Sequence, residues 1–106
     1  MSKYLMQGSY TGEGAKALLR DGGTARKAAV EAALKSQGCT LESLYFALGD
    51  TDVFCIVDAP DNATVAGVSM ATGALGAVQL KTTVLLTAQE IDAASKKGAA
   101  YRPPSK

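Results

Sequence analysis

The residue types that usually carry catalysis are sparse in this sequence, and histidine is absent from all 106 residues. Histidine is the commonest general base near neutral pH and the commonest metal ligand, so a Ser-His or Cys-His nucleophile is excluded within the chain. The two cysteines, Cys39 and Cys55, form no Cys-x-x-Cys pair, and no histidine can complete a zinc site around them. We therefore predict no metal and no cofactor, and we expect both thiols to be small buried hydrophobic groups.

Polar side chains that could bind a ligand recur at alternate positions of the predicted strands. They share one parity within each strand, so they should point to one face of a sheet. The candidate ligand-binding residues of the strands are Gln7, Ser9, Ser43, Tyr45, Gln79 and Lys81, and Thr83 follows the same pattern. Together they offer hydrogen-bond donors and one cation, a composition that suits a small polar or anionic ligand. Alternatively, these side chains satisfy one another or water at a hydrated interface.

Arg26 is a further candidate ligand-binding residue. It lies near a predicted helix start, on a stripe with Val30 and Leu34 at helical spacing. An arginine in this position either packs its aliphatic stem and keeps its head in solvent, or faces an anion or a partner subunit. The sequence leaves both interpretations open.

Two further patterns are similar to binding motifs but have simpler explanations. The glycine-rich run 8–14 lies between a strand and a helix, but it lacks the lysine and the spacing of a phosphate-binding loop. The aspartates of the 50–52 turn lie roughly 20 Å from Asp58 and Asp61, at opposite ends of a predicted strand, so one metal site cannot use both pairs. We assign these glycines and acids to turns and helix caps.

The charge balance argues against a nucleic-acid partner. The chain carries 11 Lys plus Arg against 10 Asp plus Glu, a net charge of +1, and its adjacent basic pairs lie beside acidic residues. No apolar run approaches the ~18 residues of a membrane span, and the first residues lead into a strand pattern without a signal-peptide cleavage site. We therefore predict a cytoplasmic protein with no nucleic-acid or membrane partner.

Hydrophobic periodicity predicts one domain at 1–98. The predicted strands are 4–10, 41–48, 53–57 and 78–86, and the predicted helical segments are 15–20, 24–37, 63–74 and 88–97, with a break at 21–23. Thr24 and Thr87 are the expected N-caps, the second in a capping box with Glu90. The tail 99–106 contains two prolines and is expected to be frayed or extended.

The order β-α-β-β-α-β-α predicts an α+β fold of the ferredoxin-like type with an extra C-terminal helix. We expect a four-stranded antiparallel sheet with helices on one face. The strands 4–10 and 53–57 are expected at the centre of the sheet and parallel to each other, and the connection at 50–52 is short enough to predict a hairpin. A stripe of mostly small residues from Ala63 to Ala74 is expected to lie close against the sheet.

The second face of such a sheet should be polar in a monomer, but here both faces are partly apolar. In the third strand, one side carries Phe54 and Ile56 and the other carries Val53, Cys55 and Val57. Something must cover the open face, and a second copy of the same sheet is the economical answer. We therefore predict a homodimer or a higher homo-oligomer.

Two runs, 45–53 (YFALGDTDV) and 56–61 (IVDAPD), resemble the signature of the GYD domain family, and the resemblance extends over nearly the whole chain. It implies a small bacterial protein of largely unknown function, with a ferredoxin-like fold of the dimeric α+β barrel type. Gly49 and Asp52 match the family's Gly-x-Tyr-Asp pattern. Thr51 stands where that pattern has tyrosine, so a role that needs the aromatic ring is not carried over.

These observations fit functions from different classes. The first is a non-catalytic oligomeric module that binds a small polar or anionic ligand between sheets. The alternative is a cofactor-independent enzyme, monooxygenase- or isomerase-like as in relatives of the barrel group, acting on a small aromatic or carbonyl compound. Tyr45 would then be the acid or hydrogen-bond donor, and Lys81 would steer an anionic substrate. A third option is a purely structural assembly role, whereas haem binding is disfavoured because no histidine can be the axial ligand.

Overall fold

The computed structural model describes residues 1–98, and the predicted tail 99–106 lies outside the described residues. The strands are β1 (Ser2–Tyr10), β2 (Thr40–Phe46), β3 (Val53–Ala59) and β4 (Val78–Leu85), and the helices are α1 (Gly12–Asp21), α2 (Gly23–Ser36), α3 (Asn62–Ala74) and α4 (Ala88–Lys96). This arrangement confirms the predicted α+β, ferredoxin-like fold with an added C-terminal helix. The break expected at 21–23 divides the first helical region into α1 and α2.

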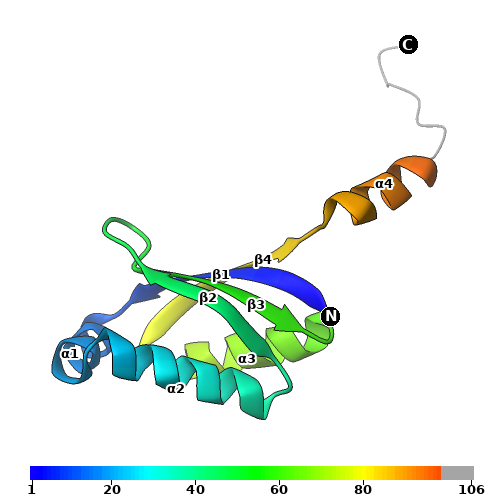
Figure 1. Ribbon diagram of the computed structural model, residues 1–106. Coiled ribbons are helices and arrows are strands. Elements are labelled where there is room, and N and C mark those ends of the chain that lie inside the picture. Colours follow the sequence, from blue (N-terminus) through cyan, green and yellow to red (C-terminus); the bar gives the residue numbers. More distant parts are fainter. Residues whose placement is uncertain (99–106) are drawn as a thin grey trace.

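The four strands form one sheet in the order β2-β3-β1-β4, and all neighbouring strands are antiparallel (Figure 1). β1 and β3 are central as expected, but the prediction that they would be parallel is wrong. The crossover through α1 and α2 returns β2 in the direction of β1, and the hairpin that follows reverses the chain. β3 consequently runs opposite to β1.

An irregularity in β2 turns two large side chains toward the helices. The register of β2 against β3 shifts between Leu41 and Ser43. This bulge places one extra residue in β2, so the strict alternation that the sequence suggests is interrupted. Leu41 and Leu44 consequently share one side of the sheet, where both are buried.

One face of the sheet is covered by α1, α2 and α3, and the core lies between these helices and the strands (Figure 1). Tyr4 and Val57 are the largest fully buried side chains, and Leu34 of α2 and Val65 of α3 belong to the same buried cluster. No helix among the described residues lies over the opposite face of the sheet. We call these two sides the covered face and the open face.

The side of α3 that packs on the covered face differs from the prediction. Val65 is buried and Val68 packs against the core. The expected small-residue stripe from Ala63 to Ala74 is exposed instead, including Met70 at 75%. Valine side chains bury more apolar surface than alanine or glycine, so packing on the sheet favours the valine side of the helix.

The two predicted N-caps have different outcomes. Thr87 and Glu90 form the expected capping box at the start of α4, with hydrogen bonds of 3.0 and 3.1 Å. The predicted N-cap Thr24 is wrong, because α2 begins at Gly23 and its N-cap is Gly22, two residues before Thr24. Gly22 has a φ of 83°, a conformation that glycine adopts at no steric cost, and it allows the sharp change of direction between α1 and α2.

A close approach between α1 and the residues before β4 explains the glycine-rich run 8–14. The Thr11 side chain accepts a hydrogen bond from the Gly14 amide, and its hydroxyl donates to the Gly76 carbonyl at 2.8 Å. A Cβ atom on Gly14 would clash with the carbonyl oxygen of Ala77, so only glycine permits this packing. Thr11 therefore has the capping role predicted for this run, but the turn role predicted for its glycines is wrong, because Gly8 lies in β1 and Gly12 and Gly14 lie in α1.

α4 projects away from the rest of the domain, beyond the end of β4 (Figure 1). None of its residues is buried, and Leu86 and Ile91 are 59% and 51% exposed. The helix is consequently supported by local interactions such as its capping box rather than by tertiary packing within the chain.

Candidate functional site

The turn between β2 and β3 is tied to the end of β1 by three hydrogen bonds. The Asp52 carboxylate accepts a hydrogen bond from the Tyr10 amide at 2.8 Å. The Asp52 amide donates to the Gly8 carbonyl at 2.8 Å, and the Ser9 hydroxyl donates to the Asp50 carbonyl at 2.7 Å. The turn is therefore fixed against β1, and the Ser9 hydroxyl proton is already donated to the Asp50 carbonyl.

The open face carries the predicted ligand-binding residues of the strands in rows that cross the sheet. One row, from β2 to β4, is Tyr45, Phe54, Gln7 and Lys81, and the next is Ser43, Ile56, Leu5 and Thr83. Ser9 and Gln79 form a further pair between β1 and β4. Since opposed residues of neighbouring strands have Cβ atoms about 5 Å apart, each row is a chain of neighbouring side chains.

The rows divide these six residues into two groups. Four of them are contiguous on β1 and β4, and we call them the polar quartet: Gln7, Ser9, Gln79 and Lys81. Ser43 and Tyr45 lie on β2 at the other edge of the sheet, where Tyr45 is 72% exposed. Three strand spacings separate Tyr45 from Lys81, about 14 Å in all. Within one chain these two residues would contact opposite ends of a small ligand rather than one reacting atom.

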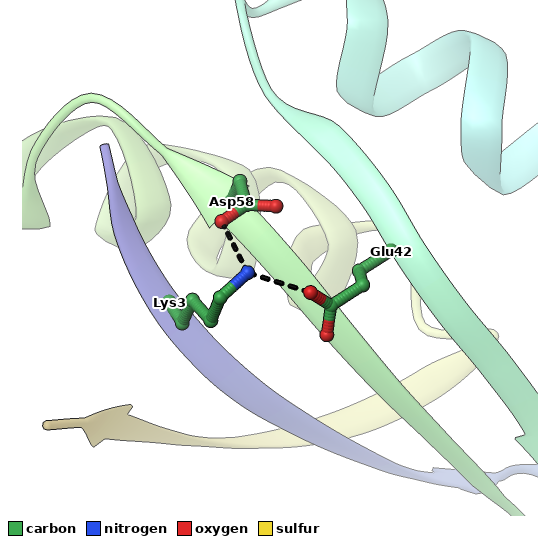
Figure 2. A network of polar contacts seen from close by, with 3 residues as sticks. All are labelled: Lys3, Glu42 and Asp58. Carbon is green, nitrogen blue, oxygen red and sulfur yellow. Dashed lines mark hydrogen bonds and ion pairs between the residues drawn. The ribbon is translucent and has the colours of Figure 1, made fainter. Parts of the chain in front are cut away.

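At the far end of the open face, one lysine is shared by two carboxylates. The Lys3 ammonium lies 2.6 Å from Oε1 of Glu42 and 2.9 Å from Oδ1 of Asp58 (Figure 2). Hydrogen bonds to Glu42 and Asp58 raise the pKa of Lys3 above its ordinary value. Gln7 lies four positions after Lys3 on β1, about 13 Å along the strand, so these carboxylates do not neutralise the polar quartet.

The seventh predicted ligand-binding residue, Arg26, lies on the other side of the sheet. It lines a cavity of about 260 Å³ between α2, α3 and the covered face, together with apolar side chains such as Val30 and Leu80. Its Nε atom is buried and has no hydrogen-bond partner within residues 1–98. The structure thus brings the six strand residues to one face and separates Arg26 from them.

This cavity has no counterpart among the sequence predictions. Ala29 and Ala33 line it from α2, on the same side of the helix as Arg26 and Val30. Small side chains beside the apolar stripe of a helix are a signal that space lies next to them, and both alanines stay exposed here. That signal does not show whether a neighbouring element fills the space, because the position of α3 depends on residues far away in the sequence.

Within residues 1–98, no three His, Cys, Asp or Glu side chains lie close enough together to hold a metal ion. Both cysteines are free thiols, and burial raises the pKa of Cys55. Because the thiolate rather than the thiol is the nucleophile and metal ligand, burial holds Cys55 in its unreactive form. In the same part of the chain, no helix is long and apolar enough to cross a membrane.

The family model of the GYD domain matches residues 4–95. The chain belongs to the GYD domain family. The match confirms the resemblance carried by the runs 45–53 and 56–61. Neither a curated protein nor a solved structure matches this GYD domain.

In this GYD domain, the matching signature residues have architectural roles. Gly49 has a φ of 126°, which residues with a side chain rarely adopt. Asp52 holds the turn against β1 through the Tyr10 amide. Thr51, which replaces the tyrosine of the pattern, is partly exposed in the turn. The signature therefore accounts for the geometry of the hairpin and supplies no aromatic group there.

Proposed function

We propose that this GYD domain is a cytoplasmic, non-catalytic module that pairs with a second copy through its open face and holds a small polar or anionic ligand over the polar quartet. The observation that carries this proposal is the composition of the open face. Partly exposed aliphatic residues, Leu5 and Ile56, lie at its centre, and hydrogen-bonding side chains with one cation lie beside them.

The aliphatic centre supports pairing with a copy of the same face. Leu5 and Ile56 are directly opposed on β1 and β3, and Phe54 and Leu85 extend the apolar surface to neighbouring rows. Antiparallel sheets expose one face readily when that face is polar, so an apolar centre favours a cover. A second sheet supplies the matching shape and chemistry in a closed symmetric dimer.

The polar quartet supports the choice of ligand. Lys81 forms no ion pair within residues 1–98, and Gln7 lies directly opposite it. The carboxylates of the open-face strands, Glu42 and Asp58, are bound to Lys3 at the far end. A lysine flanked by amide side chains and enclosed between two sheets would favour an anion that also accepts hydrogen bonds.

Two further observations favour parts of the proposal. Both cysteines are free, which fits a reducing compartment such as the cytoplasm. The separation of Tyr45 from Lys81 disfavours the enzymatic alternative in a single chain, because an acid and a charge-steering group must act near one reacting centre. The non-catalytic function is therefore the better supported of the two.

Light scattering after size-exclusion chromatography tests the pairing. We expect a dimer or higher oligomer for the unmodified domain and a monomer for Leu5→Lys, because two desolvated lysines would oppose each other at the centre of the interface. Leu19→Lys is the matched control, since Leu19 is 86% exposed on α1 away from the open face. A monomeric unmodified domain at micromolar concentration would refute the pairing.

A thermal-shift titration tests the ligand, with inorganic phosphate and succinate as probes. A ligand of the native state raises the unfolding temperature. We expect at least one probe to do so for the unmodified domain and for the exposed-charge control Lys16→Met, but not for Lys81→Met. Equal shifts in both variants would refute a role for Lys81. An oligomer without any shift would support the structural assembly role instead.

A further inference from the structure

The cavity on the covered face is a second place where a ligand could bind, and it is independent of the polar quartet. It has a volume of about 260 Å³ and lies between α2 and α3 over β1, β3 and β4. Its walls are mostly aliphatic, with Met6, Val30, Val68 and Leu80 among them. α2 and α3 each pack on the sheet rather than on one another, which leaves the space between them.

Arg26 is the one formally charged side chain in the lining of this cavity. The Nε of Arg26 is buried, and no atom within residues 1–98 accepts a hydrogen bond from it. The nearby carboxylate of Asp21 is engaged by Arg20, with N–O distances of 2.9 and 3.1 Å. A buried donor without an acceptor is unfavourable, and the penalty is larger when the donor is charged. An anion entering the cavity would supply the missing acceptor.

The size and polarity of the cavity restrict the class of ligand. An apolar cavity of roughly 150 Å³ accommodates benzene, so 260 Å³ has room for a six-membered ring with a short side chain. The polar groups of the lining are few, and the Cys55 thiol among them is kept neutral by burial. The walls therefore suit an apolar body, and the single cation suits one negative charge.

We propose that this cavity binds a small monocarboxylate with an apolar, ring-sized body, its carboxylate accepting a hydrogen bond from Nε of Arg26. Guanidinium groups bind carboxylates through short, charge-assisted hydrogen bonds. The aliphatic walls contribute by removing the apolar body from water. The proposal does not rest on the pairing of open faces, because the sheet separates the two sites.

Methyl-detected NMR with phenylacetate as the probe locates the site in the unmodified protein. We expect saturable binding and intermolecular contacts to the methyl groups of Val30, Val68 and Leu80. Phenylacetamide has the same shape without the charge, and we expect it to bind at least tenfold more weakly. Contacts at Leu5 and Ile56 instead would place the probe on the open face and overturn the proposal, as would equal affinities for the acid and the amide.

Two matched pairs of variants test the role of the Arg26 charge and the role of the space beside Ala33. Arg26→Met keeps an unbranched stem and removes the charge, while Lys27→Met removes an exposed charge from the next position of α2. The loss of a hydrogen bond to a charged group lowers affinity roughly 10- to 100-fold. We expect this loss of phenylacetate affinity in Arg26→Met and no loss in Lys27→Met. Ala33→Leu reduces the space in the cavity and should abolish binding, whereas Ala25→Leu, at a position of α2 outside the cavity lining, should not.

Unchanged phenylacetate affinity in Arg26→Met or in Ala33→Leu would overturn the proposal. If either variant fails to fold, the methyl contacts of the unmodified protein still decide the location of the probe. The failure of this site leaves the pairing through the open face untouched, since Leu5→Lys and Lys81→Met report on the other side of the sheet.

Discussion

Val57 and Ile56 are neighbours on β3, but they belong to opposite faces of the sheet. Val57 is 1% exposed beneath the helices, whereas Ile56 is partly exposed on the open face. A strand with apolar residues on both sides requires two covers. The chain supplies the first cover itself through α1, α2 and α3. In the proposed pairing the second cover is a second copy of the open face, and the two faces should then respond differently to the same substitution.

The charges on the two faces are also arranged differently. On the open face, Lys3 is paired with two carboxylates at one end, while Lys81 has no ion-pair partner within residues 1–98. On the covered side, Arg26 contributes a buried Nε to an otherwise apolar cavity. Each face thus combines an apolar surface with one cation that a ligand could neutralise, and within residues 1–98 the covered face forms its partly open cavity without a second chain.

The largest expected effect on stability comes from truncating the side chains of Val57 and Ile56 on β3. Val57→Ala should lower the free energy of unfolding by about 2–3 kcal/mol at every protein concentration, because it leaves a space in a packed core. Ile56→Ala should cost less than about 1 kcal/mol in dilute protein, where its side chain stays partly hydrated. Urea unfolding measured over a hundredfold range of concentration separates the two.

The concentration dependence of the same measurement tests whether the open face pairs with a second copy. If the open face pairs, the unfolding midpoint of the unmodified protein rises with protein concentration. The midpoint of Ile56→Ala should then rise much less over the same range. Val57→Ala keeps it. A midpoint independent of concentration in all three proteins would show that the open face has no partner copy.

A smaller effect is expected from removing one hydroxyl on each face. The Tyr4 hydroxyl donates to Oδ1 of Asn62 at 2.5 Å, and the ring is 1% exposed. Tyr4→Phe should lower the free energy of unfolding by about 1 kcal/mol, because the hydrogen bond from the buried ring to Asn62 is lost. Tyr45→Phe, at a ring 72% exposed, should change it by less than about 0.5 kcal/mol in dilute protein. Equal costs would contradict the assigned burial of the two rings.

The smallest effects concern pH, and they occur at opposite ends of the scale. Hydrogen bonds from the Thr64 side chain and amide lower the pKa of Asp61, the N-cap of α3, below its ordinary value of 3.8. Its stabilising effect is therefore complete above pH 3.8 and is lost as the pH falls through the lowered pKa. The pKa of Lys3 is raised, so the stabilising effect of its ion pairs is complete below its ordinary pKa of 10.5. That effect is lost as the pH rises through the raised pKa.

Urea unfolding between pH 2.5 and 11.5 measures both effects. Asp61→Asn should flatten the acid limb and leave the alkaline limb unchanged, and Lys3→Met should flatten the alkaline limb. Lys81→Met is the control for the alkaline limb, since Lys81 shares the open face without an ion pair among the described residues. An alkaline limb that is equally flat in Lys3→Met and Lys81→Met would show that the shared contacts of Lys3 do not persist in solution.

Much of the architecture could be predicted from local patterns, and the errors share one cause. The capping box of Thr87 and Glu90 and the hairpin before β3 depend on residues close together in the sequence, and both were predictable. The sheet-facing side of α3 was mispredicted, since a stripe of small residues and a stripe of valines both fit a helix. Only packing against β3 and β4 selects the valines.

The candidate site was predictable in part for the same reason. Alternation along a strand correctly assigned the six strand residues to one face, because a two-residue period is a local property. Their division into the polar quartet and the Ser43–Tyr45 pair depends on strand order, which alternation does not encode. The sequence singled out Arg26 as well, but not the cavity that it lines.

The sequence by itself determined which chemistry is absent, where most strands and helices lie, and the membership of the GYD domain family. These are properties of composition and of short-range periodicity, which a few neighbouring residues set. The tertiary structure decided the antiparallel centre, the bulge in β2, the buried side of α3 and the cavity beside Arg26. Each of these depends on contacts between segments far apart in the chain, where the burial of apolar surface and the pairing of backbone groups select one arrangement among several that local preferences allow.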